Sequence, residues 1–521
     1  MQAVSSPNRT RRDLVAHAAE AFPEQQFFLC SDEAMPYVTG SELLSLCKKA
    51  AALRPAEAGE RHVALLGPSS AAWISAYFAL LCSGQVVVPL HYGMKTEELA
   101  ACLRQADCEL LLYDRVALQE VEKLQQALPT LEAKPIHSFL DAVAQEAEAM
   151  FPPLDEDAPA AMYFTSGTTG SSRCVVLTHR NLASQANAIG AVLPLFREDR
   201  GLSILPLSHT FEMMTYVVGA LSCGGTLYIN ESLRTVKPNL ICCRPTILVV
   251  VPLILQTLQK EILNTARKQG RLEKLKRGMR LNGMLQRVGI DLSRRLFRDV
   301  HETFGGQLRG VICGGAALDP ELIRFYRQLG ISIYQGYGIT ECSPVVSTNS
   351  PDHDRPGSVG RPLPCCEVRI LDGEICVRGD SVFAGYYADE AATSACFRDG
   401  WFHTGDLGSL DQDGYLYFTG RLKNLIILPN GENVSPEELE ERLYRVDGVR
   451  DVLVYERDGK ITAELFADPE KIPDRDAAWR AIREVNRSLA AFKQIGDIIL
   501  RDSEFEKTAT RKIKRYQNRE G

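Results

Sequence analysis

Residues 63–90 carry no Asp, Glu, Lys or Arg, and this uncharged stretch limits the fold more than any other feature of the sequence. It is long enough to span a membrane as a helix. However, Gly-Pro-Ser-Ser at 67–70 and Ser-Gly at 83–84 divide it into a short apolar strand, a helix over 71–82 and a second apolar strand. We therefore predict a buried β-α-β unit with parallel strands that are apolar on both faces, and no transmembrane segment.

The alternation of short apolar strands with helices continues to about residue 350, which indicates α/β architecture with largely parallel sheets. Over 358–420 the strand segments are separated by glycines, so hairpins and a smaller β-rich subdomain are expected there. Ser-Pro-Glu-Glu at 435–438 is typical of a helix start. At 521 residues the chain is long enough for two or more domains. We predict a large core domain over 1–422, containing the β-rich subdomain, and a small mobile α+β domain over 423–521.

Composition excludes some functions and leaves others open. The formal charge is −7 and the pI is about 5.8, so the chain as a whole has no electrostatic reason to bind nucleic acid. Its fifteen cysteines are odd in number and scattered, and the adjacent pairs at 242–243 and 365–366 lack zinc-ligand spacing. Free thiols in a reducing compartment, and hence a cytoplasmic location, are expected. No apolar run suited to a signal peptide follows the first residues. The oligomeric state is not indicated.

Residues 267–298 are the exception to this charge balance. They contain eleven Lys or Arg against Glu273 and Asp291, interleaved with leucines and methionines. A basic amphipathic helix of this kind can lie on an anionic membrane surface. It can equally be a solvated insertion whose apolar stripe packs on its own domain. Both interpretations stay open, so the sequence allows peripheral contact with the inner membrane surface without requiring it.

The strongest chemical signal runs from Tyr163 to Arg173, where hydroxyl residues and glycines form a tight loop. Backbone N–H and side-chain O–H groups of such a loop can converge on phosphate oxygens, and Arg173 adds positive charge. It is not a Walker A loop, because that motif runs into a helix, whereas the residues that follow match a strand. An ordinary Ser/Thr/Gly hairpin is the alternative. The candidate phosphate-binding residues are Thr165, Ser166, Gly167, Thr168, Thr169, Gly170 and Arg173.

Three further motifs follow in order. Residues 335–341 combine an aromatic, a hydroxyl and a carboxylate, which can stack on a purine and hold Mg²⁺ against phosphate oxygens. Asp406 and Arg421 supply a carboxylate suited to vicinal ribose hydroxyls and a guanidinium. The basic run 507–515 matches a solvated tail, or a lysine that reaches an active site from a mobile domain. Each motif alone is also compatible with an ordinary turn or tail. The candidates in the first are Gln335, Gly336, Tyr337, Gly338, Thr340 and Glu341.

Taken in this order, the motifs resemble the successive core motifs of the adenylate-forming superfamily of acyl-CoA synthetases, peptide-synthetase adenylation domains and luciferases. The resemblance covers nearly the whole chain and is greatest to the bacterial long-chain fatty-acid CoA ligases. Residues 205–212 (LPLSHTFE) resemble the pocket-gating motif of those ligases, and 420–437 resemble their hinge region. The basic segment before 314–318 (GGAAL) also resembles theirs.

The resemblance implies an enzyme that uses ATP and Mg²⁺ to activate a medium- or long-chain fatty acid as an acyl-AMP, with release of pyrophosphate. The acyl group then passes to the thiol of coenzyme A. Lys512 would bridge the carboxylate and the α-phosphate, and rotation about Lys423 would bring the Gly431 loop to the pantetheine channel. Residues 165–170 and Arg173 would bind the β- and γ-phosphates, Glu341 would bind Mg²⁺, and Thr340 would contact the α-phosphate. Tyr337 would stack on adenine, and Asp406 and Arg421 would bind the ribose. His209 would gate the acyl pocket, whose walls would be Phe211, residues near Pro252, and Gly314, Gly315, Ala316 and Ala317.

Two departures from the family pattern keep rival functions open. The family loop usually continues Pro-Lys-Gly where this chain has Ser172, Arg173 and Cys174, so phosphate geometry can differ. The C-terminal motif usually has Gly at the position of Arg511, although Arg also occurs in the long-chain branch. The acyl group could instead pass to a phosphopantetheinyl carrier protein or another nucleophile. A non-catalytic acyl-nucleotide-binding protein is the third hypothesis, motivated by the change at 172–174.

Overall fold

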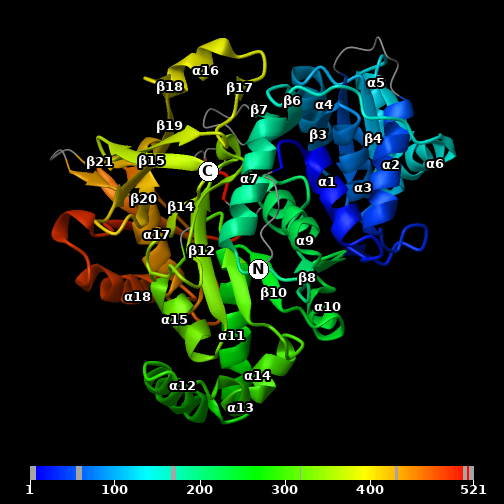
Figure 1. Ribbon diagram of the computed structural model, residues 1–521. Coiled ribbons are helices and arrows are strands. Elements are labelled where there is room, and N and C mark those ends of the chain that lie inside the picture. Colours follow the sequence, from blue (N-terminus) through cyan, green and yellow to red (C-terminus); the bar gives the residue numbers. More distant parts are fainter. Residues whose placement is uncertain are drawn as a thin grey trace.

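The computed structural model describes residues 8–53, 61–165, 172–316, 318–428, 432–507 and 513–515. It contains two large sheets with helices, a β-rich sheet and a smaller C-terminal part with its own sheet (Figure 1). Helices of the N-terminal part (blue and cyan) lie on one side of the molecule, and the C-terminal elements (orange and red) lie on the other. The predicted fold class, mainly parallel sheets followed by β-rich and α+β parts, is confirmed.

The uncharged stretch folds as predicted into β2 (His62–Gly67), α3 (Ala71–Cys82) and β3 (Val86–His91), with the two strands parallel. Ser70 begins α3 by accepting a hydrogen bond from the backbone N–H of Trp73 at 3.1 Å. Every residue of α3 is buried, and the helix packs against α2 and α6. This burial explains why α3 is apolar on all sides. Among the described residues, no helix is long and apolar enough to cross a bilayer.

Two large sheets share one apolar core. The first has the strand order β17-β7-β6-β3-β2-β4-β5, and the second β1-β9-β8-β10-β11-β12-β13-β14. Neighbouring strands are parallel from β5 to β6 in the first sheet and from β1 to β12 in the second. Helix α7 lies between the sheets in the same core. The remaining strands are β1 (Phe28–Leu29), β4 (Leu110–Tyr113), β5 (Glu132–Pro135), β6 (Pro159–Thr165), β7 (Arg173–Thr178), β8 (Arg200–Ser203), β9 (Thr226–Ile229), β10 (Ile247–Val250), β11 (Gly310–Cys313), β12 (Ser332–Gly338), β13 (Val345–Thr348), β14 (Arg361–Pro362) and β17 (Gly385–Tyr386).

Helices cover both sheets and supply most of the outer layer (Figure 1). All fifteen cysteines are free, as the sequence predicted. The helices of the N-terminal and central parts are α1 (Arg11–Ala21), α2 (Gly40–Ala52), α4 (Thr96–Gln105), α5 (Leu118–Ala127), α6 (Ile136–Gln145), α7 (His179–Val192), α8 (Thr210–Glu212), α9 (Val218–Cys223), α10 (Val236–Cys243), α11 (Pro252–Lys268), α12 (Leu272–Gln286), α13 (Ser293–Leu296), α14 (Arg298–Thr303), α15 (Pro320–Gln328) and α16 (Glu390–Cys396).

The β-rich part contains the expected hairpins. Strands β15 (Cys366–Leu371) and β16 (Glu374–Gly379) are antiparallel and joined by a turn at 372–373. Strand β19 (Trp401–Leu410) pairs with β16, β18 (Phe397–Arg398) and β20 (Leu416–Arg421). Residues from β16, β19 and β20 join the core that connects the two large sheets. The β-rich part is therefore packed onto the rest of the N-terminal unit.

The C-terminal part has an apolar core of its own, made from residues 426–498. Its sheet has the order β23-β24-β25, and β23 and β24 form a hairpin. The predicted helix start is confirmed, since Ser435 is the N-cap of α17 and Pro436 its first residue. The elements are β21 (Ile426–Ile427), β22 (Asn433–Val434), α17 (Pro436–Tyr444), β23 (Val449–Arg457), β24 (Lys460–Ala467), α18 (Arg475–Arg487) and β25 (Asp497–Arg501).

Candidate active site

Four of the predicted segments meet at one edge of the second sheet. Strands β8, β10, β11 and β12 are parallel, so their carboxyl ends lie on the same side. The segment with His209 follows β8, Pro252 follows β10, Gly314 follows β11 and Thr340 follows β12. In α/β proteins, ligands bind in crevices outside such strand ends. Segments far apart in the sequence are thus brought to the place where this architecture forms a site.

Tyr337, Asp406 and the half-buried Arg421 form a network beside this edge. The Tyr337 hydroxyl donates a hydrogen bond to Oδ2 of Asp406 at 2.8 Å, and Asp406 is only 1% exposed. Nε of Arg421 lies 3.1 Å from Oδ1 of Asp406, and the two residues are cross-strand partners on β19 and β20. Phe418 stacks on the Tyr337 ring, with 5.9 Å between centroids and an interplanar angle of 26°. Both Asp406 oxygens therefore have protein partners, and an aromatic ring already stacks on Tyr337.

Strand β12 supplies two further candidates with clear structural constraints. A Cβ on Gly338 would lie 2.2 Å from the carbonyl oxygen of Pro344, so no side chain fits where β12 approaches β13. Gln335 is 5% exposed, and no hydrogen-bond partner of its Oε1 is found within the described part of the chain. A buried acceptor without a partner is costly. A ligand that donates a hydrogen bond would satisfy Gln335, so this residue fits a binding role.

Glu341 lies in the 3₁₀ turn Thr340–Cys342, directly after β12, where Thr340 and Glu341 are half-buried. Tyr386 of β17 donates a hydrogen bond to Oε1 of Glu341 at 3.0 Å. The Arg173 guanidinium lies over the Tyr386 ring, 5.0 Å from its centroid. Burial raises the pKa of Glu341 above its ordinary value, so the ionised carboxylate lacks solvation that a bound cation could replace. Carboxylate oxygens are ligands that Mg²⁺ accepts, so Glu341 fits a magnesium site.

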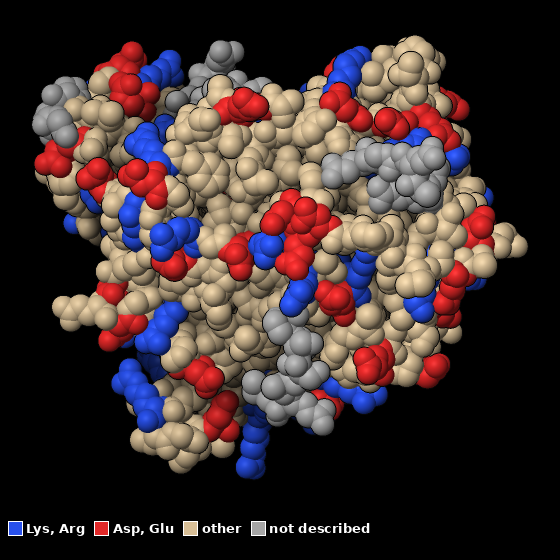
Figure 2. All heavy atoms as spheres, turned by 45° about the horizontal axis from the view of Figure 1, so that its top comes forward, with Lys and Arg blue, Asp and Glu red and all other residues tan. Residues whose placement is uncertain are grey.

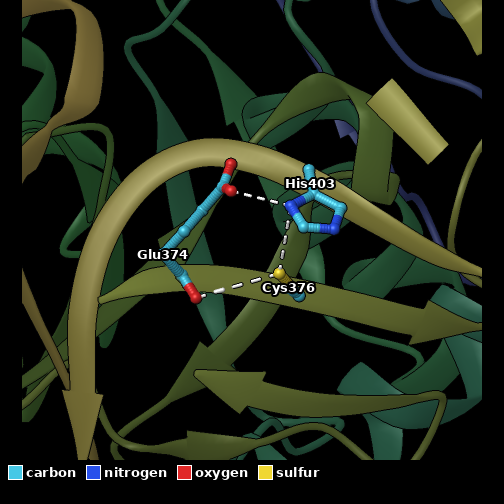
Figure 3. Close-up of side chains that lie close together, drawn as sticks. All are labelled: Glu374, Cys376 and His403. Carbon is cyan, nitrogen blue, oxygen red and sulfur yellow. Dashed lines mark hydrogen bonds and ion pairs between the residues drawn. The ribbon is translucent and has the colours of Figure 1, made fainter. Parts of the chain in front are cut away.

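Glu374 contacts the turn that precedes Asp406, and Figure 3 shows its carboxylate beside the His403 ring. Oε1 of Glu374 accepts a hydrogen bond from the backbone N–H of Gly405 at 2.7 Å, and Oε2 lies 2.7 Å from Nδ1 of His403. Sγ of Cys376 lies 3.5 Å from the same ring nitrogen. The three side chains could offer ligand atoms to a metal. Because both Glu374 oxygens already contact the His403–Asp406 turn, this carboxylate positions Asp406 instead.

Phe211, Gly314 and Val251 lie together near the same strand ends. A Cβ on Gly314 would be 3.0 Å from Cζ of Phe211, so the aromatic ring rests directly on the glycine. A Cβ on Gly315 would be 3.5 Å from Cγ1 of Val251, which directly precedes Pro252. Gly315 and Ala316 are exposed. The predicted wall residues therefore adjoin one another, with apolar side chains facing the glycine backbone.

His209 connects the edges of the two large sheets. It immediately precedes α8, and its ring lies 6.0 Å from that of His91, at the carboxyl end of β3. Burial lowers the pKa of His91, which favours its neutral form. Glu212, three residues after His209, is completely buried and bonded to the Ser203 hydroxyl at 2.5 Å. Burial raises the pKa of Glu212 to about 8, so this carboxyl is mainly protonated at neutral pH.

Several predicted residues lie outside the described part of the chain: Ser166, Gly167, Thr168, Thr169, Gly170, Ala317, Gly431, Arg511 and Lys512. The residues next to the glycine-rich loop are described, and Thr165 of β6 pairs with Arg173 of β7. The strand expected after the loop is present, and Cys174 is a buried core residue on it. Lys423 is exposed in the 3₁₀ turn Leu422–Asn424, between the two apolar cores.

The basic C-terminal run lies against the N-terminal unit at its described end. Nζ of Lys514 lies 3.4 Å from Oε1 of Glu98 on α4. Helix α4 follows the carboxyl end of β3, the strand that ends at His91. Ile513 forms a β-bridge with Lys507, which in turn pairs with Asp451 at 2.6 Å. The described residues that flank Lys512, namely Lys507 and residues 513–515, therefore contact the C-terminal sheet and helix α4 of the N-terminal unit.

Sequence reasoning missed three residues that organise the site. Tyr386 orients Glu341, Phe418 covers Tyr337, and Glu374 holds the turn before Asp406. Glu374 and Phe418 come from the β-rich sheet, whereas Tyr386 lies on β17 at the edge of the first large sheet, and each reaches its partner only through the tertiary fold. The sequence held one signal for Glu374, since it is an acidic residue that directly follows a glycine at the start of a predicted hairpin strand. Tyr386 and Phe418 gave no signal that distinguishes them from core aromatics.

Comparison with known proteins agrees with this geometry. The family described as AMP-binding enzyme matches residues 15–387. The long-chain-fatty-acid–CoA ligase FadD15 of Mycobacterium bovis is 31% identical over 450 residues, which cover 80% of this chain and 74% of the relative. The long-chain-fatty-acid–CoA ligase 6 of Mus musculus is 28% identical over 494 residues, 85% of this chain and 70% of that protein.

A solved structure gives the same architecture. The anthranilate CoA ligase AuaEII, in complex with anthranoyl-AMP, aligns with a TM-score of 0.81 at 21% identity, over 100% of this chain and 98% of that chain. At this identity the likeness concerns the fold. The family match and the FadD15 relative extend it to the sequence. The chain therefore belongs to the family of AMP-binding enzymes, as an AMP-forming acyl-CoA synthetase within the adenylate-forming superfamily.

Proposed function

We propose that this enzyme uses ATP to convert a medium- or long-chain fatty acid into an acyl-AMP, and then transfers the acyl group to the thiol of coenzyme A. The observation that carries the proposal is the buried Asp406, held by Tyr337 and Arg421 beside the strand-end residue Glu341. Asp406 with its partners and Glu341 thus form two neighbouring carboxylate sites. The first suits the hydroxyls of a ribose, and the second suits a magnesium-bound polyphosphate.

The nucleotide roles follow from these contacts. Asp406 would accept hydrogen bonds from the ribose hydroxyls, with Arg421 keeping it in place. Tyr337 would pack against the adenine, and the unsatisfied Oε1 of Gln335 would accept a hydrogen bond from the nucleotide. Residues 165–170 and Arg173 would bind the β- and γ-phosphates, and Thr340 the α-phosphate. Glu341 would hold Mg²⁺, which neutralises phosphate charge when bound.

The chemistry needs activation because a carboxylate has oxide as its leaving group. A carboxylate oxygen attacks the α-phosphorus of ATP, forming the acyl–phosphate bond as the bond to pyrophosphate breaks and pyrophosphate takes the electron pair. Cations and donors must neutralise the charge that develops. The thiolate of coenzyme A then attacks the acyl carbon, and AMP leaves. The thiol proton passes to solvent before or during this second step.

A fatty acyl substrate is supported by the apolar contacts and by the relatives. Phe211, Val251 and the Gly314 backbone would wall the acyl chain, and His209 would lie at the entrance of that pocket. The curated relatives from Mycobacterium bovis and mouse are named long-chain-fatty-acid–CoA ligases.

We further propose that residues 423–521 move as a unit about Lys423, separating the two half-reactions. Support comes from the separate apolar core of the C-terminal part, which begins after this turn. Lys512 would reach the α-phosphate in the first arrangement, because Lys514, two residues later, contacts Glu98 near the strand ends. Rotation would withdraw Lys512 and bring the Gly431 loop to the pantetheine thiol.

Pyrophosphate release, measured over straight-chain acids of increasing length with and without coenzyme A, tests the proposal. We expect acid-dependent release that is strongest for the longer chains, and an acyl-CoA product detected by mass spectrometry when coenzyme A is present. If the acyl group passed only to an added holo carrier protein, that protein would be the acceptor in place of coenzyme A. Binding of ATP without pyrophosphate release for any acid would contradict the proposal and favour a binding protein.

A further inference from the structure

Helix α12, in the basic segment 267–298, has two faces of different character. Its inner face packs on the central core through Leu275 and Met279. Asn282 is completely buried and donates a hydrogen bond to the backbone carbonyl of Gln328 at 2.9 Å, at the end of α15. Gln286 donates to the neighbouring carbonyl of Arg327 at 2.9 Å. The inner face alone therefore attaches the helix to its domain.

The outer face carries apolar side chains that this packing leaves uncovered. Arg277, Leu281 and Met284 follow one another at intervals of four and three residues, so they lie on one side of α12, and Val288 follows in the turn after the helix. The exposed face of a helix normally carries polar side chains at such positions. The exposed apolar side chains of this region are Leu281 (52%), Met284 (64%), Val288 (71%), Ile290 (49%) and Leu296 (44%).

The turn after α12 is built to present two of these side chains. The side-chain oxygen of Asn282 accepts a hydrogen bond from the backbone N–H of Leu292 at 2.9 Å. Asp291 accepts one from the N–H of Ser293 at 2.9 Å and one from the Asn282 amide at 3.3 Å. These bonds hold Asp291 and Leu292 against α12, and the exposed side chains of Val288 and Ile290 lie in the turn before them.

Basic side chains surround the apolar ones. Of the two acids in the segment, Glu273 pairs with Lys276 at 3.7 Å, and Asp291 is occupied in the turn. On the face drawn in Figure 2, which is turned toward the top of Figure 1, Lys and Arg lie interspersed with Asp and Glu. Helices α12 and α13 form the lower end of the molecule in Figure 1. Within the described residues, no acidic partner is found for Lys274, Arg277, Arg280, Arg287 and Arg295.

We infer that this surface, the outer face of α12 with the turn at 288–292 and α13, docks on an anionic lipid bilayer. Lys and Arg would contact the headgroups, while Leu281, Met284 and Val288 would enter the boundary between headgroups and acyl chains. A second copy of the same surface would meet like charge. A nucleic acid would use the cations but leave the apolar side chains in water. Only a bilayer uses both features.

Vesicle sedimentation of the full chain tests this inference. We expect binding to vesicles of phosphatidylcholine mixed with phosphatidylglycerol, little binding to phosphatidylcholine alone, and weakening as salt is raised. Two variants separate the contributions. Reversing three charges should reduce binding by about tenfold or more, and replacing three apolar side chains should reduce it by a similar order even at low salt. The variants are Arg277→Glu with Arg280→Glu and Arg287→Glu, and Leu281→Ser with Met284→Ser and Val288→Ser.

A matched control comes from another exposed region. Val116 and Leu118, at 57% and 45% exposed, lie near Arg115 and Lys123 at the start of α5. Val116→Ser with Leu118→Ser, and Arg115→Glu with Lys123→Glu, should leave vesicle binding unchanged. All variants should keep the far-ultraviolet circular dichroism of the parent and its pyrophosphate release with a soluble short-chain acid. Equal vesicle binding by the parent and the α12 variants would overturn the inference. Binding of RNA, or self-association, in place of vesicle binding would also overturn it.

Discussion

At the scale of single residues, three carboxyl groups of the site have different partners. Asp406 contacts a guanidinium and a tyrosine hydroxyl, which stabilise its negative charge. Glu212 contacts only a serine hydroxyl, and burial raises its pKa to about 8. Glu341 has a tyrosine partner and a raised pKa at the place proposed for a cation. The three carboxyl groups thus differ in their partners: Asp406 pairs with a guanidinium, Glu212 accepts a hydrogen bond from the Ser203 hydroxyl, and Glu341 is the proposed ligand of a cation.

Asp406→Asn should impair nucleotide binding and the first half-reaction. The amide keeps the shape of the side chain but loses the charge that pairs with Arg421 and that the ribose hydroxyls would meet. We expect kcat/KM for ATP in pyrophosphate release to fall by about a hundredfold, near 3 kcal/mol. Asp413→Asn, on the exposed turn of the same hairpin, should leave kcat/KM within about twofold of the parent. A normal KM for ATP in Asp406→Asn would remove the ribose assignment.

Glu212→Gln should change how stability depends on pH. In the folded chain the pKa of Glu212 is about 8, against an ordinary 4.5, so the folded state holds a proton that the unfolded state releases. Stability from this group is complete below about 4.5 and is lost as pH rises through about 8, with a slope of up to about 1.4 kcal/mol per pH unit. Urea unfolding between these values should give a flatter profile for Glu212→Gln than for the parent. The control Glu198→Gln changes an exposed carboxyl and should give the same slope as the parent. If Glu212→Gln also gave the parent slope, the Glu212 carboxyl of the parent would be ionised over this whole pH range, which would contradict the prediction.

At the scale of elements, the site depends on how closely strand β12 approaches β13. The two strands pair antiparallel at the end of a sheet that is otherwise parallel up to β12. This change of direction follows the turn with Thr340 and Glu341. Close approach at Gly338 keeps that turn against the strand end. Glycine at this position therefore serves backbone packing, and its effect on ligand contacts is indirect.

Gly338→Ala should destabilise the chain, because the new Cβ would meet the Pro344 carbonyl oxygen at 2.2 Å. We expect a loss of about 1–3 kcal/mol in the free energy of unfolding, together with slower pyrophosphate release. Gly190→Ala in α7 is the matched substitution, since its Cβ would have no atom within 4 Å. That variant should be neutral or more stable by up to about 1 kcal/mol. Equal thermal denaturation of the two variants would show that the β12–β13 contact relaxes without cost.

At the scale of the whole molecule, two parts with separate cores meet through packing of α17 on β20 and through polar contacts. Arg445 of α17 lies 2.7 Å from Asp319, the N-cap of α15, and Lys514 contacts Glu98. Exposed and half-exposed ion pairs of this kind are weak. An interface held by such contacts can be broken and formed again during a catalytic cycle. This arrangement is compatible with the proposed rotation about Lys423.

Lys512→Ala should separate the two half-reactions. If this lysine supplies charge only in adenylation, acid-dependent pyrophosphate release should fall by about a thousandfold, whereas thioester formation from supplied acyl-AMP should stay within about threefold. Lys460→Ala, an exposed lysine of the same C-terminal part, should affect neither reaction. Single-turnover measurements of both steps on one preparation decide the matter. An equal loss in both steps would contradict a role confined to adenylation.

The sequence by itself determined the elements and the order of the motifs. The apolar stretch 63–90 specified a buried β-α-β unit because turn residues interrupt it, and the helix start at Ser435 was specified by its proline and acids. These features depend on neighbours in the chain, which periodicity and turn chemistry describe. The candidate residues Tyr337, Asp406 and Arg421 were also found from local motifs.

Only the tertiary structure decided which of these residues touch and what surrounds them. Tyr386 reaches Glu341, and Phe418 reaches Tyr337, through strand pairings between segments far apart in the sequence. The basic segment was ambiguous because a helical pattern does not say which apolar residues find a partner. In the folded chain, Met279 is buried and Met284 is exposed, although both belong to the same helix. Burial is a property of the assembled surfaces, and a pattern of residues along one element cannot contain it.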